Sequence, residues 1–229
     1  MTIPIILGWS GGKDSALALH ALLEDSRYEV VSLLTTLTLD FDRISMHGVR
    51  RELLLRQAEV IGLPLEEVWI KQGAGNAEYE AAMLKSIGQF QKRGITKMAF
   101  GDLFLQDIRN YREQMLKHLK MECVFPIWGK DTSALATEFV SKGFKARTCC
   151  IDTRKLPDSF CGRDLTSEFF AALPASVDPC GENGEFHTFV YDAPNFRMPV
   201  EIETGAQRRD EPFLFCDLLF PEDASKSQV

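Results

Sequence analysis

A short string near the N-terminus combines the residue types that hold phosphate. Its members are Ser10, Gly11, Gly12, Lys13, Asp14 and Ser15. Paired glycines permit positive φ and close backbone approach, so consecutive N–H groups can face an anion, and a following helix adds its positive dipole end. The lysine supplies a point charge, the serines supply hydroxyls, and the aspartate can order the loop or hold Mg²⁺. The string predicts a phosphate-binding turn; a capped glycine turn that merely starts a helix is the alternative.

The spacing excludes two other phosphate loops. Lys13 is followed by Asp14, and no glycine stands at the required distance before Gly12, so the Walker A pattern is absent. The dinucleotide pattern with three spaced glycines is absent as well. The position of the string supports a specific loop, because an apolar strand-like run precedes it and an apolar helix-like run begins at Ala16.

The same order of strand and helix recurs along the chain. Strand-type runs cover residues 3–9, 28–37, 65–70, 97–100 and 123–128, and helical runs cover 16–23, 49–61, 77–93, 108–120 and 132–142. Five such alternations predict an α/β fold with a mostly parallel five- or six-stranded sheet and helices on both faces, because parallel neighbours need crossover connections.

The alternation ends near a last strand at residues 144–151. Beyond it prolines interrupt short segments, with a helix expected at 165–173 and strands at 187–191, 200–203 and 213–220. We therefore expect a phosphate-binding α/β domain over residues 1–150, a small C-terminal α+β subdomain on the substrate side over 151–222, and a flexible tail over 223–229.

Two segments that follow predicted strands are candidates for ligand contacts. Loops at the carboxyl ends of parallel strands line the ligand crevice of such folds. Ser45, Met46 and His47 follow the second strand and could contact adenine or ribose, although a lone histidine is more often a surface or core residue. Gly101 and Asp102 end another strand, so Asp102 could bind a metal or orient a nucleophile; helix capping is the alternative.

An acidic turn near the C-terminus is the third candidate. Glu182 and Glu185 alternate with glycines, and His187 follows in a strand-like run. Clustered carboxylates beside phosphates can bind Mg²⁺ or accept protons from an ammonium nucleophile, and an unperturbed histidine titrates near neutrality. Acidic surface turns that serve solubility are the alternative.

Composition narrows the class of protein. The net charge is −7, which argues against affinity based on neutralising nucleic-acid phosphates. The apolar runs are too short to cross a bilayer, the N-terminus lacks a basic segment, and a cytoplasmic location is expected. The six cysteines show neither a C-x-x-C pair nor a disulfide scaffold, so reduced thiols are expected.

The string at residues 10–15 resembles the pyrophosphate loop of the ATP pyrophosphatases, also called adenine nucleotide alpha hydrolases, which cleave ATP between the α and β phosphates. Three further segments resemble the diphthine-ammonia ligase family: Ser45 to Gly48, Gly101 to Asp107 with Tyr111 to Glu113, and Gly181 to Phe189. The similarity runs from about Ile5 to Pro199. Many diphthine-modifying members resemble Gly-Glu-x-Gly-Glu-Tyr-Glu-Thr in the last segment, where this chain has Phe186 and His187.

The resemblance implies an ATP-dependent ligase with Mg²⁺ that adenylates a carboxylate for attack by ammonia. In eukaryotes and archaea the family's acceptor is diphthine on elongation factor 2. The residues at 10–15, 45–47 and Gly101 would bind ATP, and Asp14 and Asp102 would hold Mg²⁺. Catalytic roles would fall to Lys13, Asp14, Asp102, Glu182, Glu185 and His187.

Two other functions stay open at this point, as does a homodimer. An RNA-modifying enzyme of the same superfamily would activate a base oxygen, but the acidic charge and the missing C-x-x-C count against it. A non-catalytic nucleotide-binding protein would hold ATP without turnover, and the carboxylate-rich turn would then have no role.

Overall fold

The computed structural model describes residues 2–44 and 47–221. The chain forms two compact units. The first unit comprises Met1–Ser10, Asp14–Ser45 and Leu63–Gly129, and the second comprises Gly11–Lys13, Met46–Gly62 and Lys130–Val229. The phosphate string, residues 10–15, therefore contributes Gly11 to Lys13 to the second unit and its flanking residues to the first.

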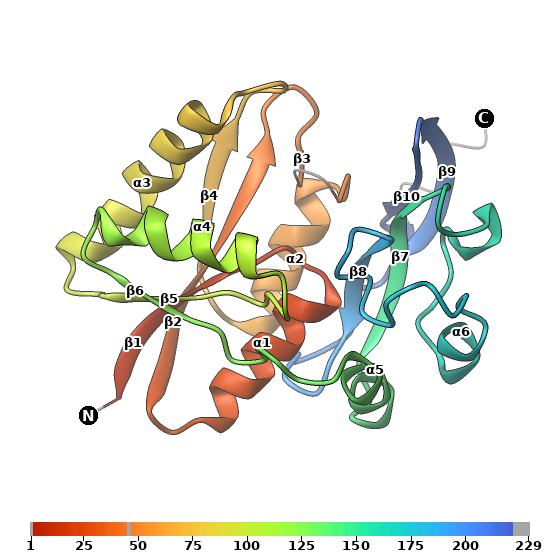
Figure 1. Cartoon of the computed structure of the whole chain (residues 1–229), viewed down its shortest axis with the longest axis horizontal. Coiled ribbons are helices and arrows are strands. Elements are labelled where there is room, and N and C mark those ends of the chain that lie inside the picture. The colour runs from red at the N-terminus through yellow and green to blue at the C-terminus, as the bar shows by residue number, and fades with distance from the viewer. Residues whose placement is uncertain (1, 45–46, 222–229) are drawn as a thin grey trace. The chain divides into compact units, whose positions relative to one another are not determined.

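The first unit contains a six-stranded sheet (Figure 1). Its strands are β1 (Ile3–Gly8), β2 (Tyr28–Thr38), β3 (Arg43–Ile44), β4 (Leu65–Ile70), β5 (Lys97–Ala99) and β6 (Glu122–Val124). The order is β3-β2-β1-β5-β6, with β4 also paired to β2. Every pairing is parallel except that of β2 with β3. The central β1 is thus flanked by β2 and β5, and its end leads into the phosphate string.

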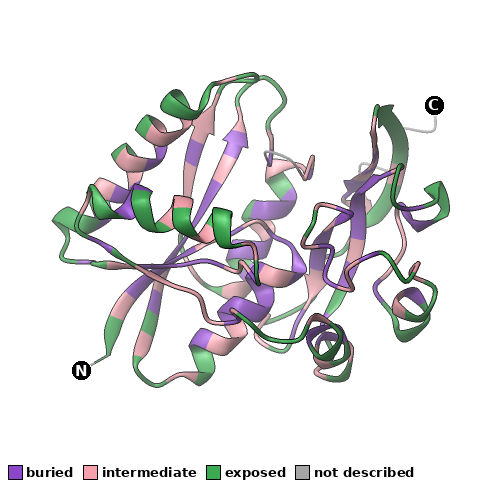
Figure 2. Ribbon diagram, viewed as in Figure 1, coloured by how far each residue is buried: buried purple, intermediate pink, exposed green. Residues whose placement is uncertain are grey.

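Helices cover both faces of this sheet because each carries an apolar stripe. Figure 1 shows α3 (Asn76–Lys92) and α4 (Gln106–Lys117) on one side and α1 (Lys13–Glu24) on the other. A core cluster joins Met83, Ile87 and Phe90 of α3 and Leu116 of α4 to strand residues such as Met98. The outward sides of α3 and α4 are exposed (Figure 2), as expected for amphipathic helices on a sheet.

The second unit contains a four-stranded antiparallel sheet in the order β8-β7-β10-β9. The strands are β7 (Lys145–Asp152), β8 (Phe186–Asp192), β9 (Glu203–Asp210) and β10 (Phe213–Leu219). The unit's helical segments are α2 (Arg51–Ile61), α5 (Thr132–Ser141), η1 (Asp158–Phe160) and α6 (Ser167–Ala171). Asp131 caps α5 by accepting the Ala134 N–H at 2.8 Å, which satisfies one of the unpaired amides of the first turn.

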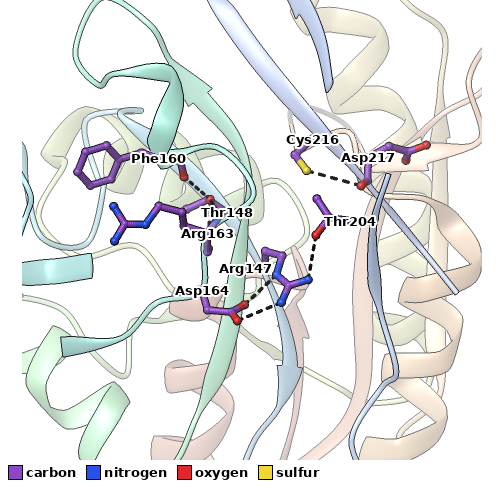
Figure 3. Close-up of polar contacts among 8 residues, drawn as sticks. All are labelled: Arg147, Thr148, Phe160, Arg163, Asp164, Thr204, Cys216 and Asp217. Carbon is purple, nitrogen blue, oxygen red and sulfur yellow. Dashed lines mark hydrogen bonds and ion pairs between the residues drawn. The ribbon is translucent and has the colours of Figure 1, made fainter. Parts of the chain in front are cut away.

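Side chains on β7 form an ion pair and hydrogen bonds with the connection that leads to α6 (Figure 3). Arg147 forms a forked pair with Asp164, with N–O distances of 2.8 and 3.0 Å, and its third nitrogen donates to Thr204. The buried Thr148 hydroxyl donates to the Phe160 carbonyl at 2.5 Å. Bidentate arginine pairs restrict geometry as well as adding energy, so β7 sets the path of this connection.

The expected fold class is confirmed: a mostly parallel sheet with helices on both faces plus a small α+β part. Several details differ. The strand expected at 144–151 is β7, and it pairs with β8 and β10 in the antiparallel sheet instead of extending the parallel one. The second compact unit includes Lys130–Val229 and therefore contains β7.

Two strands were not predicted in their observed positions. The strand expected at 200–203 is β9, which begins at Glu203 and is almost wholly exposed (Figure 2). Hydrogen bonds to β10 hold this edge strand in place, so it does not need an apolar face. Its sequence therefore lacks the apolar alternation by which a strand can be predicted. The two-residue β3 was missed, since so short an element leaves no periodic signal.

No helix in the described residues is long and apolar enough to cross a membrane. None of the cysteines, all of which lie in the described part of the chain, takes part in a disulfide. Burial raises the pKa of the Cys150 thiol to about 12, so this strand residue stays protonated near neutral pH.

Candidate active site

The turn between β1 and α1 has the backbone that its glycines predict. Gly11 has a φ of +75°, a left-handed conformation that disfavours residues with a Cβ atom. A Cβ added at Gly11 would also lie 2.9 Å from the Gln57 Oε1 atom. In the first unit, the Ser10 and Ser15 hydroxyls form a hydrogen bond at 3.2 Å, in which either can donate. The string thus folds as a tight turn that starts a helix.

Residues of β8 and α2 contact the middle of this turn inside the second unit. The Gly11 carbonyl accepts from the Val190 N–H at 2.8 Å and from Nε2 of Gln57 at 2.9 Å. The Lys13 N–H donates to Oγ1 of Thr188 at 3.0 Å. A Cβ at Gly12 would lie 3.0 Å from the Thr188 carbonyl oxygen. Gly11 to Lys13, Gln57 of α2 and the strand after the acidic turn therefore form one packed group.

Lys13, the first residue of α1, is buried, which is rare for a lysine. Only 4% of its surface is exposed, and its ammonium lies 5.4 Å from the centre of the Phe186 ring. An aromatic face attracts a cation, and the attraction grows as water is removed. A buried ammonium at a helix start, beside a glycine turn, is an arrangement that can bind phosphate oxygens.

His47 and His187 lie beside Lys13 as a pair of neighbouring rings. Their ring centroids are 4.5 Å apart with an interplanar angle of 30°. Burial, then His187 and then Lys13 hold the pKa of His47 well below its usual value. Burial and the Lys13 charge lower the pKa of His187 to about 4. The expectation that His187 titrates near neutrality is therefore wrong: both rings are neutral there, because burial and a nearby cation disfavour the imidazolium.

The lowered pKa values of this pair predict that the free energy of unfolding decreases at acid pH, which gives an acid limb in a plot of stability against pH. A depressed histidine pKa leaves stability intact above the unfolded value of about 6.5 and removes it as the pH falls toward the folded value. For His187, with a folded pKa of about 4, the loss should reach at most about 3 kcal/mol. We expect His187→Gln to make this limb shallower in urea unfolding at stepped pH, while the part due to His47 remains. His118→Gln, at an exposed position, should retain it; equal limbs in wild type and His187→Gln would contradict the assignment.

The acidic turn is ordered by hydrogen bonds of its own. The Asp178 carboxylate accepts from the N–H groups of Cys180 and Glu182, at 2.9 and 3.2 Å. Glu185 is buried, and its Oε1 accepts from Nδ2 of Asn183 at 3.2 Å. Its Oε2 is shielded from solvent and has no hydrogen-bond partner among the described residues. A buried carboxylate oxygen of this kind is an acceptor that a cationic or N–H-bearing ligand can satisfy.

Gly101 and Asp102 lie at the start of the β5–α4 connection in the first unit. A Cβ at Gly101 would lie 2.8 Å from the Asp14 carbonyl carbon and oxygen, so glycine permits close contact with the first turn of α1. Asp102 pairs with Arg112 at 3.4 Å. Burial disfavours the charge of Arg112, but Asp102 and Tyr79 outweigh it and raise the pKa of the guanidinium.

The expected Mg²⁺ site at Asp14 and Asp102 is not supported by a cluster of ligands among the described residues. The described residues contain no group of three or more His, Cys, Asp or Glu side chains that could hold an ion. Asp102 faces a guanidinium, which competes with a cation for its oxygens. The Arg109–Glu113 pair, at 2.8 Å, is an i, i+4 ion pair on α4. Ser45 and Met46, two predicted nucleotide contacts, lie outside the described residues.

The expected site residues fall into two groups. One contains Gly11, Gly12, Lys13, His47 and His187, with Glu185 directly before Phe186, the first residue of β8. The other contains Ser10, Asp14, Ser15, Gly101 and Asp102.

Gln57 and Thr188 were missed as site residues, although a signal for the first exists. Gln57 is a polar residue on the apolar stripe of α2, where its neighbours Leu53, Leu54 and Ala58 are buried. A polar side chain in such a stripe needs a hydrogen-bond partner, which the sequence does not identify.

The parallel sheet, the helices on its two faces and the Gly-Gly-Lys turn after β1 define an α/β protein of the adenine nucleotide alpha hydrolase type. Family models for the diphthamide synthase N-terminal domain and C-terminal domain match residues 4–123 and 131–218. The chain therefore belongs to the diphthamide synthase family.

The chain is similar to two proteins named diphthine–ammonia ligase, at low sequence identity. The chain is 25% identical to the diphthine–ammonia ligase of Danio rerio over 85% of its length and 84% of that protein. It is 26% identical to the diphthine–ammonia ligase of Schizosaccharomyces pombe, of which it spans 35%. Among solved structures, the U34-tRNA thiolase NcsA from Methanococcus maripaludis aligns with 61% of this chain and 58% of its own, at 17% identity and a TM-score of 0.38.

Proposed function

We propose that this protein is an ATP-dependent ligase that adenylates a carboxylate and transfers ammonia to it, with AMP and pyrophosphate as products. The acceptor class is a diphthine-like carboxylate on a protein such as elongation factor 2, and the reaction takes place in the cytoplasm. The relatives named diphthine–ammonia ligase support this class of reaction.

The observation that carries the proposal is the burial of Lys13 at the start of α1. The ammonium is nearly inaccessible and faces an aromatic ring, next to a glycine turn with a left-handed residue. A buried ammonium at the start of a helix can bind a phosphate oxygen as a point charge. The first N–H groups of the helix add to the attraction for a polyphosphate.

The proposed chemistry has two steps. A carboxylate oxygen of the acceptor attacks the α phosphorus, and the bond to the bridging oxygen breaks so that pyrophosphate leaves. Lys13 and the backbone of Gly11 and Gly12 would stabilise the leaving charge, with Ser10, Asp14 and Ser15 ordering the turn. Ammonia then attacks the acyl carbon, AMP leaves with the electron pair of the broken bond, and the nitrogen loses a proton.

The nitrogen nucleophile needs a group that accepts its hydrogens. We propose Glu185 for this role because its shielded Oε2 has no hydrogen-bond partner among the described residues. Glu182, from the same turn, and Asp102 are further candidates for contacting the acceptor or the nitrogen. His187 would act as a neutral hydrogen-bonding ring, since its pKa of about 4 leaves it a weak base near neutral pH.

Mg²⁺ enters the proposal as an ion carried by the phosphates. Proteins commonly hold it through one or two carboxylates plus substrate oxygens, and not through an all-protein cage. The described residues do not provide a three-ligand cluster, and Asp102 is paired with Arg112. Asp14 is the better placed candidate because it belongs to the turn itself. No step above depends on the ion.

Product analysis tests the proposal. The protein is incubated with ATP, Mg²⁺, ammonium and diphthine-bearing elongation factor 2, and the nucleotides are separated by chromatography. We expect AMP that depends on the acceptor, and loss of that AMP in Asp14→Asn. ADP as the product would overturn the cleavage between the α and β phosphates. Tight ATP binding without turnover, in every acceptor fraction of a cell extract, would instead favour a nucleotide-binding protein.

A further inference from the structure

Gln57 lies deep in the second unit, and both of its side-chain N–H bonds have a role. Its surface is 0% exposed, and Nε2 donates to the Gly11 carbonyl at 2.9 Å and to the Val190 carbonyl at 2.5 Å. A buried carboxamide is costly unless it is hydrogen-bonded. The neighbouring helix positions Leu53 and Leu54 are buried and apolar, so packing alone would favour an apolar residue here.

The Gly11 carbonyl is the point on which these contacts converge. It accepts from Gln57 and also from the Val190 N–H at 2.8 Å, and a carbonyl oxygen has two lone pairs to offer. Both lone pairs are therefore engaged, one by α2 and one by β8. In a trans peptide the N–H points opposite to the C=O. The Gly12 N–H accordingly points away from the two groups that donate to the Gly11 carbonyl.

A peptide between two glycines has little intrinsic preference for one orientation. Neither Gly11 nor Gly12 has a Cβ atom, so rotation of the peptide by half a turn meets few steric barriers. The rotated peptide would present the Gly11 carbonyl dipole, negative end outward, to any anion that approaches the turn. An orientation that suits an anion must therefore be imposed from outside the turn.

Thr188 holds the next residue of the turn in the same way. Its Oγ1 accepts the Lys13 N–H at 3.0 Å. This amide belongs to the first turn of α1, where N–H groups have no partner within the helix. Thr188 thus caps α1 from a separate strand, and it orients the residue whose side chain carries the charge.

We propose that Gln57 and Thr188 are positioning residues that lock the Gly11–Gly12 peptide and the start of α1 in the orientation that receives the phosphates of ATP. The predicted effect of these residues on ATP binding and turnover rests on the proposed function. Their predicted effect on the conformation of the turn does not. Neither residue contacts substrate in this scheme, and both act through the backbone of the turn.

Gln57→Leu is the first test, because leucine keeps most of the volume and removes both donors. If the turn then divides between two peptide orientations, the apparent affinity falls by the fraction that is competent. We expect the dissociation constant for ATP in calorimetry and the KM for ATP to rise by about tenfold, with kcat within about twofold. A merely destabilised protein would lose active fraction, which lowers kcat and leaves KM unchanged.

Gln57→Glu provides a rescue that only a hydrogen-bond donor can give. Burial raises the pKa of the introduced carboxyl, and its protonated form retains one O–H donor for the Gly11 carbonyl. ATP affinity of Gln57→Glu should therefore improve from about pH 8 to about pH 6, while that of Gln57→Leu stays level. His187 does not interfere, because its pKa of about 4 lies below this range.

Thr188→Val and Thr188→Ser form a matched pair. Valine has the shape of threonine without the hydroxyl, and serine keeps the hydroxyl. We expect Thr188→Val to weaken ATP binding several-fold and Thr188→Ser to restore it. Phe139→Leu, a buried change in α5, is the control for lost stability and should leave KM for ATP unaltered.

Hydrogen exchange of the Gly12 and Lys13 amides, measured without nucleotide, separates this inference from the proposed function. Faster exchange of these amides in Gln57→Leu and Thr188→Val than in Phe139→Leu supports the lock even if wild type fails to bind ATP, a result that would overturn only the proposed function. Unchanged exchange, or wild-type ATP affinity in Gln57→Leu, overturns the lock.

Discussion

Lys13→Met should lower ATP cleavage by at least about a hundredfold, because it removes the cation that would face the charge developing on the leaving pyrophosphate. Methionine matches the length of the lysine stem. Since Lys13 is 4% exposed, the substitution replaces a buried charge with an apolar group, and urea unfolding measures its effect on stability separately from its effect on activity. Loss of activity in a protein of unchanged stability would then be assigned to the charge.

The same variant has a readout that requires no substrate. The Lys13 charge lowers the pKa of His187 and of His47. In Lys13→Met the pKa of His187 should therefore rise from about 4, which ring-proton NMR titration would follow. Lys92→Met, at an exposed position in α3, is the control and should leave both activity and the histidines unchanged. An active Lys13→Met protein would rule out the proposed role of the charge.

Gly101→Ala should cost about 2–3 kcal/mol of stability and reduce ATP affinity as well, because the added methyl has no room. It would lie 2.8 Å from the Asp14 carbonyl carbon and 3.0 Å from the Ser15 nitrogen, both rigid backbone atoms. The first turn of α1 must then move away from the β5–α4 connection. Because Asp14 and Ser15 belong to the phosphate string, that movement changes the turn. Urea unfolding and ATP calorimetry measure the two effects.

Gly88→Ala is the matched control for that experiment. Gly88 lies inside α3, and the nearest atom to an added Cβ is 4.0 Å away, on Leu119. Replacing a helix-interior glycine by alanine at a position with space should raise stability by about 0.5–1 kcal/mol. Opposite signs for the two glycine substitutions would establish that close backbone contact, and not the loss of glycine itself, is responsible. Equal small effects at both sites would refute the contact argument.

The repeating order of strands and helices could be predicted because it is a local property. The apolar run of β1, the glycine turn and the buried stripe of α1 each occupy consecutive residues, so hydrophobic periodicity reveals them without knowledge of the fold. The phosphate string likewise combines its chemistry within six consecutive positions, 10–15. Beyond β6 the prediction weakened: β7 looked like one more strand of the parallel sheet, but its partners are β8 and β10.

The sequence by itself therefore determined the α/β class, the glycine turn after β1 and the place of Lys13 at the start of α1, since each depends on neighbours in the chain. Only the tertiary structure decided the sheet that β7 joins, the protonation state of His187 and the contacts of Gln57. The physical reason is common to all three. Strand pairing, desolvation and buried hydrogen bonds depend on residues far apart in sequence, such as Gln57 with Val190 and His187 with Lys13, and no local pattern records which of them will meet.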